Sequence, residues 1–532
     1  MAPKVLVSDK LSETAVQIFR DRGIDVDFEP DLGKNKVRLR EAIGQYDGLA
    51  IRSATKVTPK VLEAAGRLKV IGRAGIGVDN IDISAASKKG VVVMNTPFGN
   101  SITTAEHAIA LMMAVARQIP EANTSTHAGK WEKSRFMGVE VTAKTLGLIG
   151  CGNIGSIVAD RALGLKMKVV AYDPFLSEER AARLGVTKVE LDDLLARADF
   201  ITLHVPLTDK TRGILSAKNI AKTKKGVRII NCARGGLVDE EALARALKAG
   251  HVAGAGFDVF EHEPATDSPL FGLENVVVTP HLGASTREAQ ENVAIQVAEQ
   301  MSDYLLTGAV SNSLNMPAVT AEEATVMGPW VKLAEHLGAF VGQMTEEPIK
   351  AINILYDGAV AEMNLPALEC ATIAGIMKAT NPDVNMVSAP VIARERGIQV
   401  SQTTQEKSGV FDAYIKLTVV TDSRERTIAG TVFSDGKPRF IQIKGINIDA
   451  EIGQHMLYTT NKDVPGIIGT LGATLGAGGV NIANFTLGRK EVGGDAIALL
   501  YVDAPVPEPV LRSLSKTGMF QSVKPLEFAV AE

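Results

Sequence analysis

An arginine, a glutamate and a histidine follow three expected strands in the middle of the sequence, each after an apolar run: Arg234, Glu263 and His281. Histidine can take or give a proton near neutral pH, and a carboxylate beside it can orient the ring and stabilise its charged form. The planar fork of arginine suits the carboxylate and carbonyl of a 2-hydroxy or 2-keto acid. These three side chains could therefore oxidise a small hydroxy acid, provided that a hydride acceptor lies beside them.

A glycine-rich turn predicts that acceptor. Residues 150–155 match G-x-G-x-x-G, follow an apolar run at 146–149 and open a helical pattern over 153–163. The next expected strand, 167–172, ends in an acid, Asp173. Free N–H groups at the start of the helix would bind a pyrophosphate, and Asp173 would accept from the ribose hydroxyls and repel a 2′-phosphate. We therefore expect NAD rather than NADP, bound by Gly150, Gly152, Asn153, Ile154, Gly155 and Asp173.

The elements that must position these residues are alternating strands and helices. Apolar runs at 4–8, 48–52, 69–72 and 91–95 predict strands with helical patterns between them. A second series of strands extends to 279. Such alternation predicts parallel sheets, which bind ligands at the carboxyl ends of their strands. The fold expected is α/β, with a flavodoxin-like substrate lobe and a Rossmann NAD-binding lobe.

Arginines on two loops of the first lobe could bind an anion. Arg52 and Arg73 follow expected strands, and Arg73 lies in a glycine-rich loop with free N–H groups. A basic loop at 129–135 surrounds Trp131. Taken alone, each arginine also fits an ordinary surface turn, and the loop is either solvated or a lid or subunit contact that reaches a phosphate or carboxylate.

Three other histidines compete for the catalytic role. His107 lies among apolar residues of an expected helix over 100–117, as satisfied interior histidines do. His204 ends a strand, but Val205-Pro206 leads the chain into a loop, and His262 adjoins Glu263 and should point elsewhere. The small residues after His281 leave room for a nicotinamide, which favours His281.

Together these motifs resemble the D-isomer-specific 2-hydroxyacid dehydrogenase family. The resemblance covers residues 1 to about 315 and rests on the glycine-rich turn with Asp173, Asn-Cys-Ala-Arg-Gly-Gly, Phe-Asp-Val-Phe-Glu-His-Glu-Pro and Pro-His-Leu-Gly-Ala-Ser-Thr. It implies that Arg234 orients the substrate, that His281 is the acid/base and that Glu263 is its partner. We expect the cofactor site to include Cys232, whose thiol would be a bystander, as well as Ala233, Arg234, Asp258, His281, Gly283 and Ala284.

Narrower motifs at 52–58, 72–80 and 129–132 resemble the phosphoglycerate dehydrogenase branch of that family. This resemblance implies NAD-dependent oxidation of 3-phosphoglycerate to 3-phosphohydroxypyruvate, the first committed step of L-serine biosynthesis. It also implies that the first lobe closes over the substrate and that the basic loop can come from a neighbouring subunit. If the substrate carries a phosphate, the arginines of the first lobe and the cations of the basic loop at 129–135 could all bind it. The expected substrate site is Arg52, Ser53, Arg73, Gly75, Asn100, Trp131, Lys133 and Arg135.

The second half of the chain is expected to be regulatory. Residues 319–450 show no catalytic constellation and resemble the intervening α+β domain of long relatives, although a structural spacer is an equal alternative. Residues 454–532 read as βαββαβ, a ferredoxin-like order that resembles an ACT domain. Such domains pair across subunits and often bind amino acids. The resemblance implies that Asp463 and Asn481 contact an effector, L-serine, although Asp463 would serve equally as a helix N-cap.

The predicted domains are a discontinuous substrate-binding domain (1–98 and 287–317), an NAD-binding domain (99–286), an intervening domain (318–452) and an ACT domain (453–532). The run at 464–488 lacks charge but is rich in glycine, so it predicts helix, turn and strand rather than a membrane span.

Composition restricts the class of protein. A net charge of −4 favours neither nucleic acid nor acidic membranes as a partner, and three cysteines without metal-type spacing predict neither disulfides nor a metal site. Without a signal-peptide pattern, we expect a cytoplasmic protein. The family resemblance implies in addition that the chain self-associates as a homodimer or homotetramer.

Two other functions stay open. One is a glyoxylate or hydroxypyruvate reductase of the same family, and the other is a non-catalytic NAD-sensing binding protein on the same fold. The presence of all three catalytic candidates argues against the second.

Overall fold

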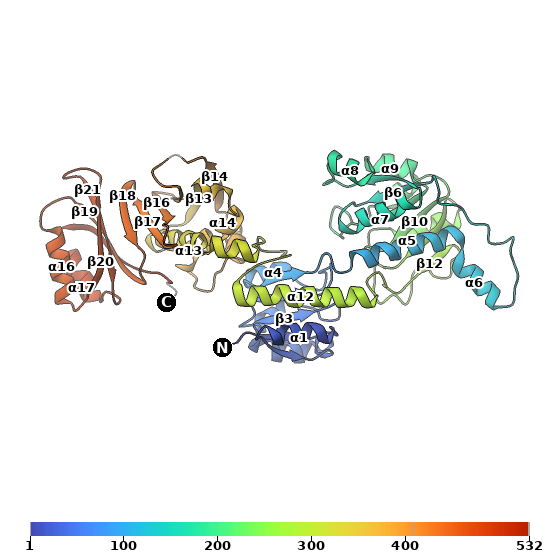
Figure 1. Cartoon of the computed structure of the whole chain (residues 1–532), viewed down its shortest axis with the longest axis horizontal. Helices are drawn as coiled ribbons and strands as arrows, with labels where there is room; N and C mark the ends of the chain where they lie inside the picture. Colours follow the sequence, from blue (N-terminus) through green and yellow to red (C-terminus); the bar gives the residue numbers. More distant parts are fainter. Residues whose placement is uncertain (1, 408, 530–532) are drawn as a thin grey trace.

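A computed structural model describes residues 2–407 and 409–529. The molecule is elongated, with the NAD-binding lobe at one end, the substrate lobe in the middle and the carboxyl-terminal half at the other end (Figure 1). Met1 and residues 530–532, the ends of the first and last predicted domains, lie outside the described residues.

The first lobe is built on a five-stranded parallel sheet in the order β2-β1-β3-β4-β5, the flavodoxin-like order that we expected. Most of its strand residues are buried because helices cover both faces, which explains their continuous apolar runs. Strand bounds are β1 Lys4–Val7, β2 Asp25–Phe28, β3 Gly48–Ile51, β4 Val70–Arg73 and β5 Val92–Asn95. The helices are α1 Glu13–Asp21, α2 Lys36–Ala42, α3 Pro59–Ala64 and α4 Ile83–Lys88.

The second lobe has a seven-stranded parallel sheet in the order β12-β11-β10-β9-β6-β7-β8. The strand order reverses between β6 and β9, and ligands of such sheets bind at the carboxyl ends beside that reversal. Its strands are β6 Thr145–Ile149, β7 Lys168–Tyr172, β8 Thr187–Lys188, β9 Phe200–Leu203, β10 Val227–Asn231, β11 Val252–Phe257 and β12 Val276–Val278. Its helices are α5 Ser101–Arg117, α6 Ile119–His127, α7 Asn153–Gly164, α8 Glu178–Leu184, α9 Leu191–Arg197, α10 Ala217–Ala221 and α11 Glu240–Lys248.

The chain crosses between the lobes twice, just before α5 and just before α12 (Arg287–Thr307). Helix α5 packs on α7, β10 and β11 of the second lobe, whereas α12 returns to pack on α1 and β4 of the first (Figure 1). A side chain at Gly72 would overlap Met301, so this glycine lets α12 approach β4 closely. The two crossings leave a cleft between the lobes.

The carboxyl-terminal half holds a mixed six-stranded sheet and a four-stranded antiparallel sheet, ordered β14-β13-β15-β16-β17-β18 and β20-β21-β19-β22. The second, with α16 and α17, has the expected ferredoxin-like βαββαβ order, so the predicted fold class is confirmed. The bounds are α13 Ala321–Met344, β13 Ile349–Gly358, α14 Leu365–Lys378, α15 Ala389–Glu395, β14 Gln399–Gln405, β15 Ala413–Thr421, β16 Glu425–Val432, β17 Pro438–Ile443, β18 Ile446–Glu451, β19 His455–Lys462, α16 Ile467–Ala477, β20 Ile482–Arg489, β21 Asp495–Val502, α17 Glu508–Lys516 and β22 Phe520–Glu527.

The two carboxyl-terminal sheets share one hydrophobic core. Phe340 on α13 lies edge-on to Phe440 of the first sheet and to Tyr458 of the second, with ring centroids 5.6 and 5.3 Å apart. Strand β20 lies along β18, where the Thr486 hydroxyl donates to the Asp449 carbonyl over 3.2 Å. We call residues 321–529 the carboxyl-terminal module. It touches the substrate lobe where Asn385 Nδ2 donates to the Gly90 carbonyl over 2.8 Å.

The uncharged run at 464–488 forms α16 and β20, and no helix among the described residues has the length and apolar character needed to cross a membrane. Helix α13 spans Ala321–Met344, although its apolar pattern is clear in the sequence only from about Trp330 to Val341. Thr320 and Glu323 form a capping box at its start, and the helix continues through Pro329.

Candidate active site

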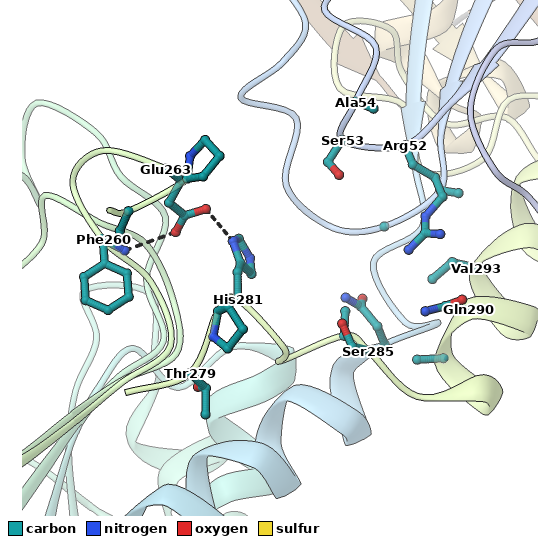
Figure 2. Close-up of a pocket in the computed structure, with 18 of the residues that line it drawn as sticks. Arg52, Ser53, Ala54, Phe260, Glu263, Thr279, His281, Ser285, Gln290 and Val293 are labelled. Atoms are coloured by element: carbon teal, nitrogen blue, oxygen red, sulfur yellow. Dashed lines mark hydrogen bonds and ion pairs between the residues drawn. The ribbon is translucent and has the colours of Figure 1, made fainter. Parts of the chain in front are cut away.

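His281 and Glu263 form a hydrogen-bonded pair at the edge of the NAD-binding lobe, with 2.7 Å between His281 Nδ1 and Glu263 Oε2 (Figure 2). The other carboxylate oxygen accepts from the backbone N–H of Phe260 over 3.1 Å. The bond to Glu263 raises the pKa of His281 above its usual value, and burial opposes that rise. Burial would raise the pKa of Glu263, but the bonds from His281 and Phe260 outweigh it and lower this pKa. Glu263 is therefore an anion that fixes one ring nitrogen and leaves Nε2 to exchange a proton.

The loop that carries His281 is held by Asp258, which follows β11. Its carboxylate accepts from the backbone N–H groups of Leu282 and Gly283 over 2.7 and 2.8 Å and from the Thr279 hydroxyl over 2.6 Å. His281 itself has a positive φ of 56°. Since the Asp258 side chain is fully enclosed by protein, its evident role is to position the loop. Its direct contact with a cofactor stays a prediction.

The competing histidines have other surroundings. His107 Nε2 lies 3.1 Å from the Thr279 hydroxyl and 3.2 Å from Asp258 Oδ1, behind the loop that carries His281. Burial lowers the pKa of His204 to about 3, and its Nε2 lies 2.9 Å from the Thr202 hydroxyl. His204 is therefore neutral and enclosed, and neither histidine lines the cleft.

The facing wall of the cleft comes from the substrate lobe (Figure 2). Arg52, Ser53, Arg73 and Gly75 of this lobe, together with Asn100 at the crossing between the lobes, line the same cavity as Glu263 and His281, which has a volume of about 850 Å³. The loop of Arg52 is anchored by Asp9, whose carboxylate accepts from the Arg52 backbone N–H over 2.6 Å. Five of the eight predicted substrate residues thus lie together, across the cavity from the histidine.

Arg73 is a partly buried cation of this wall. Its Nε is buried and has no hydrogen-bond partner among the described residues. Burial, followed by the charges of Arg234 and Arg52, lowers the pKa of Arg73 to about 10. A desolvated cation held beside two like charges is costly unless an anion joins it. The wall is therefore built to receive a negatively charged group.

Arg234 lies on the loop after β10, and its side chain points toward the substrate lobe. Its Nε donates to Asp79 Oδ2 over 3.0 Å, and its Nη1 donates to the Ala233 carbonyl over 2.6 Å. Its charge acts on His281, lowering that residue's pKa slightly against the effect of Glu263. Arg234 is thus near His281 and Glu263, but its side chain is held by Asp79 of the opposite lobe and not by either of these two residues.

The basic loop does not reach the cleft of its own chain. Trp131 is 87% exposed, and Arg135 pairs with Glu132 and Glu274 at 3.1 and 3.2 Å. None of Trp131, Lys133 and Arg135 lines the cavity, because α6 carries the loop outward at the far end of the NAD-binding lobe (Figure 1). Within one chain, the predicted substrate site therefore lacks these three residues.

The glycine-rich turn fits a dinucleotide. Gly150 has φ 93°, and side chains at Gly150 and Gly155 would overlap the backbone of His204 and Gly150 respectively. A side chain at Gly152 would meet no protein atom within 4 Å, so the space before the start of α7 is open for a pyrophosphate.

The acid beyond the turn is fixed toward it. Asp173 accepts from the backbone N–H groups of Cys151 and Phe175, each over 2.8 Å, at the end of β7. Its orientation is therefore set, and its remaining lone pairs can accept from ribose hydroxyls. Farther along, burial raises the pKa of the Cys232 thiol, so the thiol stays protonated and is no nucleophile.

Sequence reasoning missed several residues that line the cavity, among them Gln290 and Lys56. Gln290 lies in the first turn of α12 on the same side as Arg52 (Figure 2), and Lys56 follows the Arg52 loop. A signal for Gln290 existed: it comes one helical turn after the loop of His281.

The two predicted effector residues have separate partners in the carboxyl-terminal module. Asp463 Oδ2 accepts from Arg489 Nη1 over 2.8 Å and from the Gly493 N–H over 3.1 Å, and Asn481 Nδ2 donates to Asp503 over 2.7 Å. Gly466 is the N-cap of α16, so the alternative of Asp463 as a helix cap is wrong.

Comparisons with known proteins agree with this architecture. The family described as D-isomer specific 2-hydroxyacid dehydrogenase, NAD binding domain, matches residues 109–283. The D-3-phosphoglycerate dehydrogenase intervening domain matches residues 326–444. A solved glyoxylate reductase from Paecilomyes thermophila is 31% identical with a TM-score of 0.55, and covers 59% of this chain and 98% of its own.

Two curated relatives extend over nearly the whole chain, and both bear the name D-3-phosphoglycerate dehydrogenase. The one from Synechocystis sp. is 44% identical over 97% of this chain and 93% of its own length. The one from Bacillus subtilis is 42% identical over 98% of this chain and 99% of its own.

The two lobes and their cleft are thus those of an NAD-dependent D-isomer-specific 2-hydroxyacid dehydrogenase. With the intervening domain and the full-length similarity, the chain belongs to the D-3-phosphoglycerate dehydrogenase family, in its long form.

Proposed function

We propose that this chain oxidises 3-phospho-D-glycerate to 3-phosphohydroxypyruvate with NAD, in the cleft between its two lobes. This is the first committed step of L-serine biosynthesis, the activity of the family to which the chain belongs. One observation carries the assignment of the site: the paired His281 and Glu263 line the same cavity as Arg52 and Arg73, and the buried Nε of Arg73 has no hydrogen-bond partner among the described residues.

His281 is the acid/base of this proposal. In the oxidative direction its neutral Nε2 takes the proton of the substrate 2-hydroxyl, and Glu263 stabilises the imidazolium that forms. Bound NAD supplies the hydride acceptor. The turn at 150–155 and Asp173 would hold it, with the backbone of Cys232 and Ala233 and the loop of Gly283 and Ala284 along the nicotinamide side.

Different arginines bind the two ends of the substrate in this proposal. Arg234 binds the carboxylate and carbonyl end, next to the reacting carbon, and polarises the forming carbonyl. Arg52 and Arg73, with Ser53, Gly75 and Asn100 beside them, bind the phosphate end. A lactate-type substrate would leave Arg52 and Arg73 without an anion, which supports a phosphorylated one.

The exposed loop of Trp131, Lys133 and Arg135 serves a neighbouring subunit in this proposal. A tryptophan that is 87% exposed beside uncovered cations suits a surface that becomes buried in a homodimer or homotetramer. The three cysteines are free and buried, which suits the reducing conditions of the cytoplasm.

The carboxyl-terminal module would bind L-serine as a feedback inhibitor near Asp463 and Asn481. Serine titrated from micromolar to millimolar should lower the rate and raise the melting temperature of the protein. Flat responses of both would remove this part of the proposal.

The deciding experiment measures NADH formation from 3-phosphoglycerate and from glycerate. A large preference for the phosphorylated acid is expected. Activity restricted to glyoxylate or hydroxypyruvate would instead assign the chain to reductases, and full activity of His281→Ala would overturn the acid/base assignment.

A further inference from the structure

The arginine expected to bind the reacting end of the substrate is held by the opposite lobe. Arg234 belongs to the NAD-binding lobe, and its Nε donates to Asp79 Oδ2 of the substrate lobe over 3.0 Å. Among the described residues, this is the one ion pair that joins the two lobes. The sequence drew attention to the loop 72–80 but gave Asp79 no role.

The same loop touches the guanidinium with its backbone. A Cβ at Gly77 would lie 1.7 Å from Arg234 Nη2, so a larger residue there would displace this end of the guanidinium. On the other side, Nη1 donates to the Ala233 carbonyl over 2.6 Å. With Asp79 at Nε, the plane of the guanidinium is defined from three directions. Since the fork of arginine binds a carboxylate through that plane, its orientation decides how it meets a substrate.

The loop that carries Asp79 is itself fixed to the substrate lobe. Asn95 at the end of β5 donates through Nδ2 to the Ile76 carbonyl over 2.7 Å, and the Gly75 N–H donates to the Thr96 hydroxyl over 2.6 Å. Asn80 donates through Nδ2 to the carbonyls of Arg52 and Thr55, both over 2.7 Å. The loop that orients Arg234 is therefore bonded to the loop that presents Arg52.

The negative charge of Asp79 also reduces the repulsion among the neighbouring arginines. Arg52, Arg73 and Arg234 act on one another as like charges, and the negative charge of Asp79 opposes this effect at Arg73. A carboxylate among three cations keeps them close together before an anionic substrate arrives. Because it already has an arginine as partner, it repels the substrate less than a free carboxylate would.

We propose that Asp79 is a positioning residue for Arg234, which makes the substrate lobe orient the group that binds the reacting end of the substrate. This inference rests on the proposed function. It means that the lobe that binds the phosphate end also sets the geometry at the carboxylate end. A displaced substrate lobe would misplace Arg234 and slow the reaction, even with NAD and His281 in place.

The first test compares Asp79→Asn with Asp82→Asn. Asparagine keeps the shape of Asp79 but removes its charge, and kcat for 3-phosphoglycerate should fall about 10- to 100-fold, the cost of a catalytic group displaced by about 1 Å. Affinity for NAD, measured by fluorescence titration, should not change. Asp82 lies three residues along and caps α4 by accepting from the Ala85 N–H over 2.9 Å. Asparagine caps helices about as well as aspartate, so Asp82→Asn should leave both stability and kcat nearly unchanged.

A double-mutant cycle separates positioning from a general structural role. Arg234→Lys keeps the charge but loses both Nε and the fork. If Asp79 acts through Arg234, Asp79→Asn should change kcat/KM less than about 2-fold in the Arg234→Lys background, because the interaction is already absent. Equal losses in both backgrounds, a loss of NAD affinity, or a wild-type kcat for Asp79→Asn would each overturn the inference. The rate of the wild-type protein decides the proposed function separately.

Discussion

At the scale of single residues, the proposed acid/base role of His281 makes the direction of the reaction depend on the charge of its ring. Oxidation needs the neutral ring and reduction needs the protonated ring, and Glu263 raises the pKa that separates them. In the wild-type protein, the oxidative rate should therefore rise as pH increases through this raised pKa, and the reductive rate should fall over the same range.

The variant Glu263→Gln should move that midpoint to lower pH, because the main cause of the raised pKa is removed. The maximal rate should also fall on the order of 10²-fold, since the ring loses its orienting partner. Profiles of kcat/KM against pH in both directions measure the two effects. Glu261→Gln, two residues away, is the control and should match the wild type. An unchanged midpoint in Glu263→Gln would refute the role of the pair.

The proposed binding of the substrate phosphate by Arg52 and Arg73 predicts a substrate-dependent defect. Removing the cation in Arg52→Ala should raise KM for 3-phosphoglycerate about 10- to 100-fold, the usual loss for a charge-assisted hydrogen bond. Turnover of a short 2-keto acid should change little, because it has no group at that end of the cleft. Steady-state kinetics on both substrates give the comparison, with Arg20→Ala on α1 as a surface control. Equal losses on both substrates would contradict the assignment of this wall.

Contacts between site residues can be predicted from the sequence when both residues lie at the edge of the same sheet. Glu263 and His281 follow neighbouring strands, so their proximity could be anticipated, and they lie 2.7 Å apart. The bond between Arg234 and Asp79 could not, because it joins edges of two different sheets whose relative placement no strand pattern encodes. The position of Trp131 depends in the same way on where α6 points.

At the scale of elements, the junction of β6 and α7 depends on one close approach. A methyl group at Gly155 would overlap the carbonyl of Gly150, which is backbone that cannot turn aside. Gly155→Ala should therefore distort the turn and raise the Kd for NAD at least about 10-fold. Isothermal titration with NAD measures the change.

Gly164, at the other end of α7, is the matched control. A methyl group there meets nothing within 4 Å, so Gly164→Ala should leave NAD binding unchanged and add up to about 1 kcal/mol of stability. If both substitutions weaken binding equally, the effect comes from the helix as a whole and not from the turn.

Element positions were readable from the sequence where apolar periodicity and a cap agree. Residues 239–249 combine a helical apolar pattern with an aspartate at its start, and α11 begins at Glu240 with Asp239 as its N-cap. For α13, periodicity alone located only the middle, because its first turns are exposed and Pro329 hides their continuity with the capping box at Thr320. The end turns of such a helix are exposed and carry few apolar residues, so periodicity does not locate the helix ends.

At the scale of the whole molecule, the sequence separates the intervening and ACT parts, but their side chains form a common core. Buried residues of α13, β17, β19 and β22 belong to one cluster, which includes Phe340, Phe440, Tyr458 and Phe528. Sequence patterns show that a helix or sheet has an apolar face, but they do not show which other element packs against that face. A ligand on the four-stranded sheet would therefore act on a unit that also contacts the substrate lobe at Gly90.

Phe340→Ala tests whether this unit is cooperative. Phe340 is 4% exposed and touches aromatic rings of both sheets, so its removal should cost about 3–5 kcal/mol. Because the core is shared, hydrogen exchange should accelerate in β17 and in β19 to the same extent. Val410→Ala, at a position 95% exposed, is the control and should change neither strand. Faster exchange in β17 alone would mean that the two sheets unfold separately, and the coupling from the four-stranded sheet to the substrate lobe would then need another route.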